Sequence, residues 1–80
     1  MFANKYLFIV KNKNGKIINK VYDDQYIYDK LDAFDEADKL FEAAYSFGYN
    51  PVRLIFFLNN EKVLSLKSRS FYLFDGDYYE

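Results

Sequence analysis

One segment of this chain has helical periodicity, and its position between two strand-like regions constrains the fold most strongly. Residues 31–51, LDAFDEADKLFEAAYSFGYNP, place apolar side chains on one side of a helix. That apolar stripe consists of Phe34, Ala37, Leu40, Phe41, Ala44 and Tyr45. Asp32 is the predicted N-cap, and the acids around it suit the positive end of the helix dipole. Gly48 fits the left-handed position after the last turn, and Pro51 is predicted to stop the helix.

The region before the helix is predicted to be a β-hairpin. Residues 5–11 and 16–22 are rich in β-branched and aromatic side chains, and they flank Asn14-Gly15. Asn-Gly is the strongest short turn signal, because both central positions of a type I′ turn need positive φ. We therefore expect two antiparallel strands joined by a two-residue loop.

The region after the helix predicts a second hairpin. Residues 53–74 contain two strand-like runs around a turn at Asn59, Asn60 and Glu61, whereas residues 23–30 are a connector with at most a short extended piece. The predicted fold is a small α+β domain, ββαββ, with a four-stranded mostly antiparallel sheet and one helix packed on one face. Residues 1–80 form a single domain in this prediction, with 75–80 as a mobile tail.

Strand alternation assigns the predicted side chains to two sheet faces. A two-residue loop at Asn14-Gly15 places these lysines on one face: Lys5, Lys11, Lys13, Lys16 and Lys20. Four hydrophobic residues share that face: Leu7, Ile9, Ile18 and Tyr22. An even loop in the second hairpin adds Leu54, Phe56, Leu58, Val63, Lys67 and Arg69. One helix covers one face only, so this lysine-rich face is expected to be uncovered.

The helix is then expected to pack on the opposite face. The first hairpin contributes Tyr6, Phe8, Val10, Ile17 and Val21 to it. The second hairpin contributes Ile55, Phe57, Leu64 and Leu66.

Composition points away from catalysis. The sequence has no histidine and no cysteine, which removes the commonest general base, the commonest metal ligand and any thiolate. Its glycines stand alone, so no phosphate-binding loop is present. The close carboxylate pairs are Asp23/Asp24, Asp35/Asp38 and Asp75/Asp77, and acid pairs need a concave site to act. We expect no enzymatic activity, no cofactor and no metal.

Charge is unevenly distributed along the chain. Residues 1–22 carry five lysines and no acid, whereas residues 23–50 carry eight acids and two lysines. An acidic surface is predicted from the helix and the tail: Asp32, Asp35, Glu36, Asp38, Glu42, Asp75, Asp77, Tyr78 and Tyr79. Such a surface can occupy a basic groove as nucleic acid would. The plainer interpretation is a solvated helix face on which Asp35 and Lys39 pair.

These features predict a non-enzymatic binding protein that inhibits or regulates a host macromolecule, such as a nucleic-acid-handling enzyme. Abundant Phe, Tyr, Ile, Asn and Lys indicate an A/T-rich genome and favour a phage or mobile element as the source. No stretch approaches the roughly 20 apolar residues of a membrane span, so we expect a cytoplasmic protein without a membrane partner. The expected partner is a protein.

Two alternatives use the sheet instead of the helix. A nucleic-acid-binding module would use Lys11, Lys13, Lys16, Lys20, Phe56, Lys67 and Arg69. A homodimer would bury the uncovered face or pair an edge strand. The lysines could also only protect edge strands against unwanted pairing.

Overall fold

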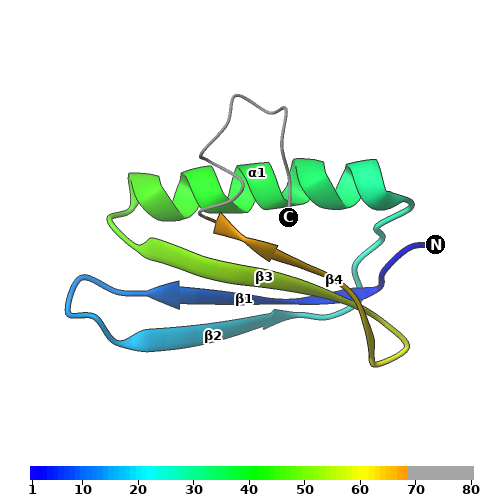
Figure 1. The fold of residues 1–80 in the computed structure, drawn as a ribbon, viewed down its shortest axis with the longest axis horizontal. Helices are drawn as coiled ribbons and strands as arrows, with labels where there is room; N and C mark the ends of the chain where they lie inside the picture. Colours follow the sequence, from blue (N-terminus) through cyan, green and yellow to red (C-terminus); the bar gives the residue numbers. More distant parts are fainter. Residues whose placement is uncertain (69–80) are drawn as a thin grey trace.

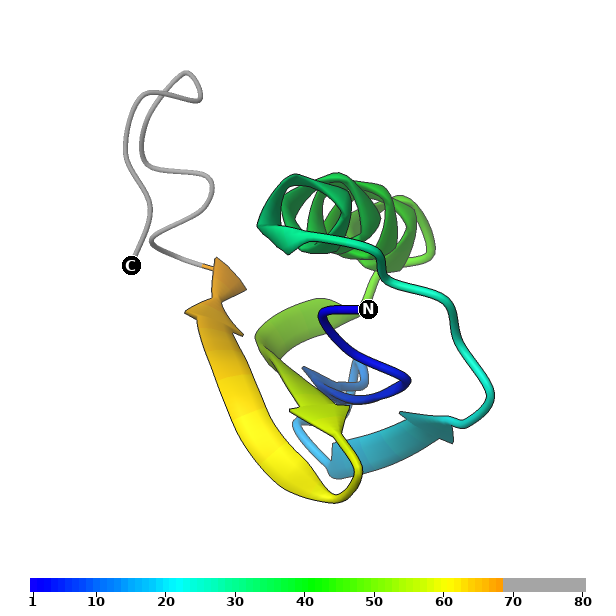
Figure 2. The same cartoon turned by 90° about the vertical axis from the view of Figure 1, so that its right-hand side faces the viewer.

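A computed structural model of the chain describes residues 1–68 and contains one four-stranded sheet with a helix on one face (Figure 1). The elements are β1 (Lys5–Lys11), β2 (Ile17–Tyr22), α1 (Lys30–Ser46), β3 (Asn50–Leu58) and β4 (Glu61–Lys67). This ββαββ order confirms the predicted fold. The spatial order is β2-β1-β3-β4 with every neighbouring pair antiparallel, so β2 and β4 are the two edges (Figure 2).

The helix begins one turn earlier than predicted. Asp29, not Asp32, is the N-cap, because its carboxylate accepts a hydrogen bond from the backbone N–H of Asp32 at 2.9 Å. The Asp32 carboxylate in turn accepts from the N–H of Tyr28 at 3.2 Å. The first bond satisfies a backbone donor that the first turn leaves open, and the second ties the residue before the N-cap to the helix.

The helix ends through Gly48 and not through Pro51. Gly48 has φ +81°, the left-handed conformation that closes a helix, and the N–H of Tyr49 returns to the carbonyl of Ala44 at 2.9 Å. Pro51 is instead a buried residue of β3 opposite Val10, beside a β-bulge. Pro is tolerated there because a bulge interrupts the ladder.

The first hairpin has a three-residue loop, so the predicted two-residue loop is wrong. Gly15 donates its N–H to the carbonyl of Asn12 at 3.0 Å, and Asn12 donates its own N–H to the carbonyl of Lys16 at 2.9 Å. Gly15 has φ +82°. A type I turn followed by a left-handed glycine is the usual three-residue connection, and the Asn12 side chain supports it by accepting from the N–H groups of Asn14 and Lys16.

This odd loop reverses the predicted faces of β2. The pairs that share the helix side are Tyr6 with Tyr22, Phe8 with Lys20, and Val10 with Ile18. Lys20 therefore lies on the helix side and not on the uncovered face, as the predicted loop had implied. Ile17 and Val21 lie on the uncovered side and are 48% and 59% exposed. A shift of one residue moves every side chain of a strand to the other face.

A bulge changes the faces of the second hairpin as well. Asn59 and Asn60 both have positive φ and form the predicted turn. The register then shifts between Phe56 and Phe57, which leaves Val63 as the extra residue of β4. Fully buried Phe56 stands opposite Tyr6 of β1, so it lies on the helix side and not on the uncovered side as predicted. Leu54 shares this side with Phe56, and Ile55 and Phe57 lie on the other. The bulge then places Leu64 and Leu66 of β4 on the helix side and Lys67 on the uncovered side.

One hydrophobic cluster fills the space between the helix and the sheet. The helix contributes Ala33, Ala37, Phe41 and Ala44, all buried. The Phe41 ring lies 5.8 Å from the ring of Phe8 on β1. Alanines at three of these positions let the helix approach the sheet closely while one aromatic ring fills the centre. Within residues 1–68 no helix has the length and apolar character that crossing a bilayer requires.

Candidate functional site

The uncovered face of the sheet combines an apolar centre with charged strand residues that are all cationic, and Asp23 and Asp24 lie in the pocket beside Lys5 at one end. Alternation from the observed register places six hydrophobic residues on it: Leu7, Ile9, Ile17, Val21, Ile55 and Phe57. The charged residues on it are Lys5, Lys11, Arg53, Lys62 and Lys67. None of the acids in β1 to β4 shares this face, and we call this set the cationic sheet face.

Two cations on this face stand directly opposite each other. Arg53 of β3 pairs with Lys67 of β4, and Arg53 is fixed by a 2.6 Å hydrogen bond to the Ser65 hydroxyl. Like charges in this arrangement destabilise a sheet. No acid of residues 1–68 neutralises either group by an ion pair, so an anionic partner would relieve the repulsion.

A hollow lies at the end of the sheet near this pair, and its lining extends from the uncovered face to Tyr45 of α1. The hollow has a volume of about 510 Å³ and includes Lys11, Arg53 and Lys67 in its wall. Its other described residues are Tyr45, Asn50, Pro51, Val52 and Ser68. Three cations therefore converge on one concave region.

The centre of the face offers little for base stacking. Phe57 is its one aromatic residue in the described chain, and the Lys5 ammonium lies 5.3 Å from the centre of its ring. Tyr22 and Phe56, which were predicted to lie on the uncovered face, lie on the helix side, where each ring packs against Tyr6. The aliphatic side chains between the strands suit an apolar partner surface better than nucleobases.

The residues predicted for nucleic-acid binding do not lie together. Lys11 and Lys67 lie on the cationic sheet face, whereas Lys13 lies in the hairpin loop and Lys16 directly after it. Lys20 and Phe56 lie on the helix side, for the reasons of register given above. Arg69 is outside the described residues.

Sequence reasoning missed six residues of this face, among them Ile55 and Phe57, which were predicted to face the helix. Lys62 joins it because of the bulge in β4, and Ile17 and Val21 join it because of the odd loop. Arg53, Ile55 and Phe57 join it because β3 pairs them with the uncovered side of β1. The one signal for the loop was Asn12, whose side chain suits the first position of a type I turn. The bulge had no sequence signal that we can identify.

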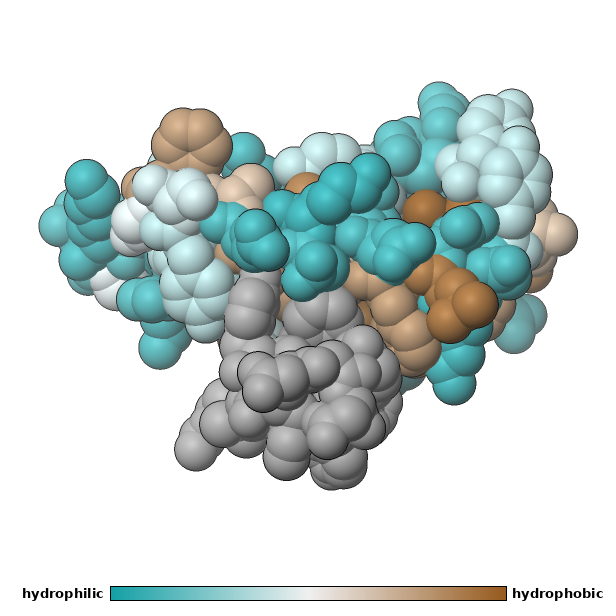
Figure 3. All heavy atoms as spheres, turned by 90° about the horizontal axis from the view of Figure 1, so that it is seen from above, coloured by the Kyte–Doolittle hydropathy of each residue, from teal (hydrophilic) through white to brown (hydrophobic). Residues whose placement is uncertain are grey.

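The predicted acidic surface is only partly assembled. Asp35, Asp38 and Glu42 are exposed and lie along one side of α1. Viewed from the helix side, hydrophilic residues dominate the surface over α1 (Figure 3). Asp32 is used in the capping interaction, and the four tail residues Asp75, Asp77, Tyr78 and Tyr79 are outside the described residues.

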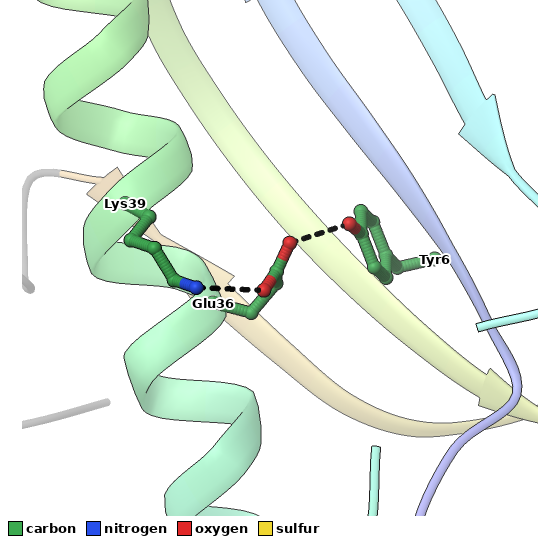
Figure 4. A network of polar contacts seen from close by, with 3 residues as sticks. All are labelled: Tyr6, Glu36 and Lys39. Atoms are coloured by element: carbon green, nitrogen blue, oxygen red, sulfur yellow. Dashed lines mark hydrogen bonds and ion pairs between the residues drawn. The ribbon is translucent and has the colours of Figure 1, made fainter. Parts of the chain in front are cut away.

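Glu36 turns from this surface toward the sheet. Its carboxylate accepts a 2.7 Å hydrogen bond from the Tyr6 hydroxyl, and the Lys39 ammonium lies 3.8 Å from its other oxygen (Figure 4). Lys39 thus pairs with Glu36. The predicted pair of Asp35 and Lys39 is not formed. Burial and, after it, the hydrogen bond to Glu36 raise the pKa of Tyr6 well above its usual value. Tyr6 is therefore a neutral donor that fixes Glu36 in place.

A smaller groove of about 190 Å³ lies between α1 and the edge strand β2. Its lining includes Lys20 and Tyr22 of β2 and Leu40 of α1. At one end stands Phe47, whose side chain is 75% exposed. No cluster of three or more acidic, histidine or cysteine residues suited to a metal occurs among residues 1–68.

Comparison of the chain with protein-family models, with curated proteins and with solved structures gives no match in any of the three.

Proposed function

We propose that this chain is a non-enzymatic binding protein that holds a partner protein on the cationic sheet face. The observation that carries the proposal is the composition of that face, which is apolar in the centre, cationic around it and free of acids in β1 to β4. An exposed apolar patch rimmed by polar groups is typical of an interaction site. The lack of histidine and cysteine supports binding over catalysis.

The chemistry of the face selects its partner. The opposed pair of Arg53 and Lys67, with Lys11 beside them, favours carboxylate groups. The aliphatic centre favours apolar side chains, so the partner is a protein surface with acidic groups around a hydrophobic one. A single strand of nucleic acid would supply anions but would find few rings on which to stack.

A second candidate is the blocking of a basic groove by the acidic side of α1. The exposure of Asp35, Asp38 and Glu42 on one side of the helix supports it. An inhibitor carried by a phage or other mobile element would act in this way, and composition alone supports that source. Localisation in the cytoplasm belongs to the same proposal.

Pairs of variants with equal charge changes distinguish these surfaces. Lys11→Glu with Lys67→Glu changes the cationic sheet face, whereas Lys13→Glu with Lys16→Glu makes the same change at the exposed hairpin loop. The triple change of Asp35, Asp38 and Glu42 to Ala removes the helix acids. Each tagged chain is mixed with source-cell lysate, and retained proteins are quantified by mass spectrometry.

We expect proteins that are retained by the wild type, the loop variant and the helix variant to be lost from the sheet-face variant. Loss from the helix variant alone would replace the proposal with the groove-blocking candidate. Equal retention by all chains would refute both. A labelled oligothymidylate bound at low salt, with affinity that falls steeply as salt rises, would instead support the nucleic-acid module.

A further inference from the structure

The outer edge of β2 is unpaired and regular. β2 is the first strand of the sheet order, and no other strand of residues 1–68 lies beyond it (Figure 2). It pairs with β1 without any register shift, whereas the other edge strand, β4, is interrupted by the bulge at Val63. Bulges protect edges against pairing, and β2 has no bulge or proline. From this edge we infer that two copies of the chain pair through β2.

The hairpin shows which backbone groups of β2 point outward. Asn12 and Lys16 face each other and are joined by a backbone hydrogen bond. Hydrogen-bonded pairs alternate along an antiparallel ladder, so Ile18, Lys20 and Tyr22 direct their N–H and C=O groups to β1. The groups of Ile17, Asn19 and Val21 point to the open edge.

One antiparallel register of two β2 strands satisfies all of these outward groups. It places Asn19 opposite Asn19 of the second copy, and Ile17 opposite Val21. The three pairs form about six backbone hydrogen bonds, because each hydrogen-bonded pair exchanges two. The apolar pairs cover side chains that are 48% and 59% exposed in the single chain.

The two neighbouring registers are unfavourable. Of the shifts that keep the faces aligned, one places Lys20 opposite Lys20 and the other places Lys20 opposite Lys16. Like charges at directly opposed positions are destabilising. In the Asn19-centred register Lys20 lies opposite Ile18 instead. The charges of β2 therefore select one register. The twofold axis that relates the two copies passes between their Asn19 residues.

This pairing differs from stacking of the uncovered faces. Stacking would bring the five cations of one copy against those of the other, which like-charge repulsion opposes. Edge pairing joins two four-stranded sheets into one of eight strands and leaves both cationic faces open on the same side. The inferred dimer would present two adjacent copies of the proposed binding surface.

Sedimentation of the full chain tests the pairing. The wild type should shift with concentration from 9.6 kDa toward twice that mass. Asn19→Lys places two ammonium groups at the axis and should give the monomer. Asn19→Pro removes an outward donor that β1 does not use, and it should also give the monomer. Val63→Lys puts the same charge on the other edge strand and should leave the dimer intact.

Crosslinking tests the register. Opposed residues of a hydrogen-bonded pair have Cα atoms about 5.5 Å apart, within the range of a disulfide. The chain has no cysteine, so Asn19→Cys introduces a single thiol that should oxidise readily to a covalent dimer. Val63→Cys should remain uncrosslinked under the same conditions.

A wild-type chain that stays at monomer mass up to millimolar concentration would overturn the inference. So would a dimer that persists in both Asn19→Lys and Asn19→Pro, or a dimer in which Asn19→Cys does not crosslink. Capture results for the cationic sheet face do not depend on these outcomes, because Lys11 and Lys67 are not in β2.

Discussion

At the scale of single residues, Tyr6 connects the core to the polar side of the molecule. Its ring is 2% exposed and stacks on Tyr22 at 4.9 Å, while its hydroxyl donates to Glu36 at 2.7 Å. A buried hydroxyl needs a partner, because an unsatisfied polar group in the interior is costly. Glu36 supplies that partner, although it was predicted to belong to the acidic surface.

Tyr6→Phe should lower the free energy of unfolding by roughly 1–2 kcal/mol, because it removes a hydrogen bond to a charged acceptor and keeps the ring. Urea denaturation followed by circular dichroism measures the loss. Tyr22→Phe is the matched control, since the Tyr22 hydroxyl makes no hydrogen bond within residues 1–68. Equal losses in both variants would contradict a special role for the Tyr6 hydroxyl.

The ionisation of Tyr6 should make stability depend on alkaline pH. Its folded-state pKa lies above the unfolded value of about 10, with burial as the main cause and the bond to Glu36 as the second. This contribution is fully present below pH of about 10 and is lost as pH rises through the folded-state pKa. Ultraviolet titration should show a late phase in the wild type that is absent from Tyr6→Phe.

At the scale of elements, the start of α1 and the loop of the first hairpin depend on local chemistry. Asp29→Ala should destabilise the protein by about 1 kcal/mol, because Asp29 is the observed N-cap. Asp35→Ala, in the exposed middle of the same helix, should be close to neutral. Thermal unfolding of the two variants checks this. The reverse order of effects would show that the helix begins elsewhere.

The loop of the first hairpin is tested at Gly15. Gly15→Ala should cost about 1 kcal/mol, because φ is +82° and a Cβ atom there has open space, so only backbone strain contributes. Gly15→Asn should cost less, since Asn tolerates the left-handed conformation. Chemical denaturation compares them, and equal costs would argue against backbone strain as the cause.

At the scale of the whole molecule, one core makes the fold cooperative. An 80-residue chain has a total stability of roughly 4–12 kcal/mol. Phe41→Ala removes the central fully buried ring and should cost about 3–5 kcal/mol, which leaves little stability. Phe41→Leu should retain much more. Helix and sheet signals should disappear together in every variant, and separate transitions would contradict a single core.

The elements and their order could be predicted from the sequence because they depend on neighbouring residues. The apolar spacing from Phe34 to Tyr45, the turn residues Asn59 and Asn60, and the left-handed Gly48 each act within a few positions. The candidate site could be predicted only in part. Lys11 and Lys67 were placed on the uncovered face, whereas Lys20 and Phe56 were misplaced.

The sequence by itself determined that two hairpins flank one amphipathic helix, because periodicity and turn chemistry are local. Only the tertiary structure decided which side chains face the helix. An Asn-Gly turn is compatible with both a two-residue and a three-residue loop, and the difference is a single residue of register. Packing against the helix selects between them, because it must bury Ile18 and Tyr22 or Ile17 and Val21. That choice is energetic and long-range, so the cationic sheet face appears only once the core is formed.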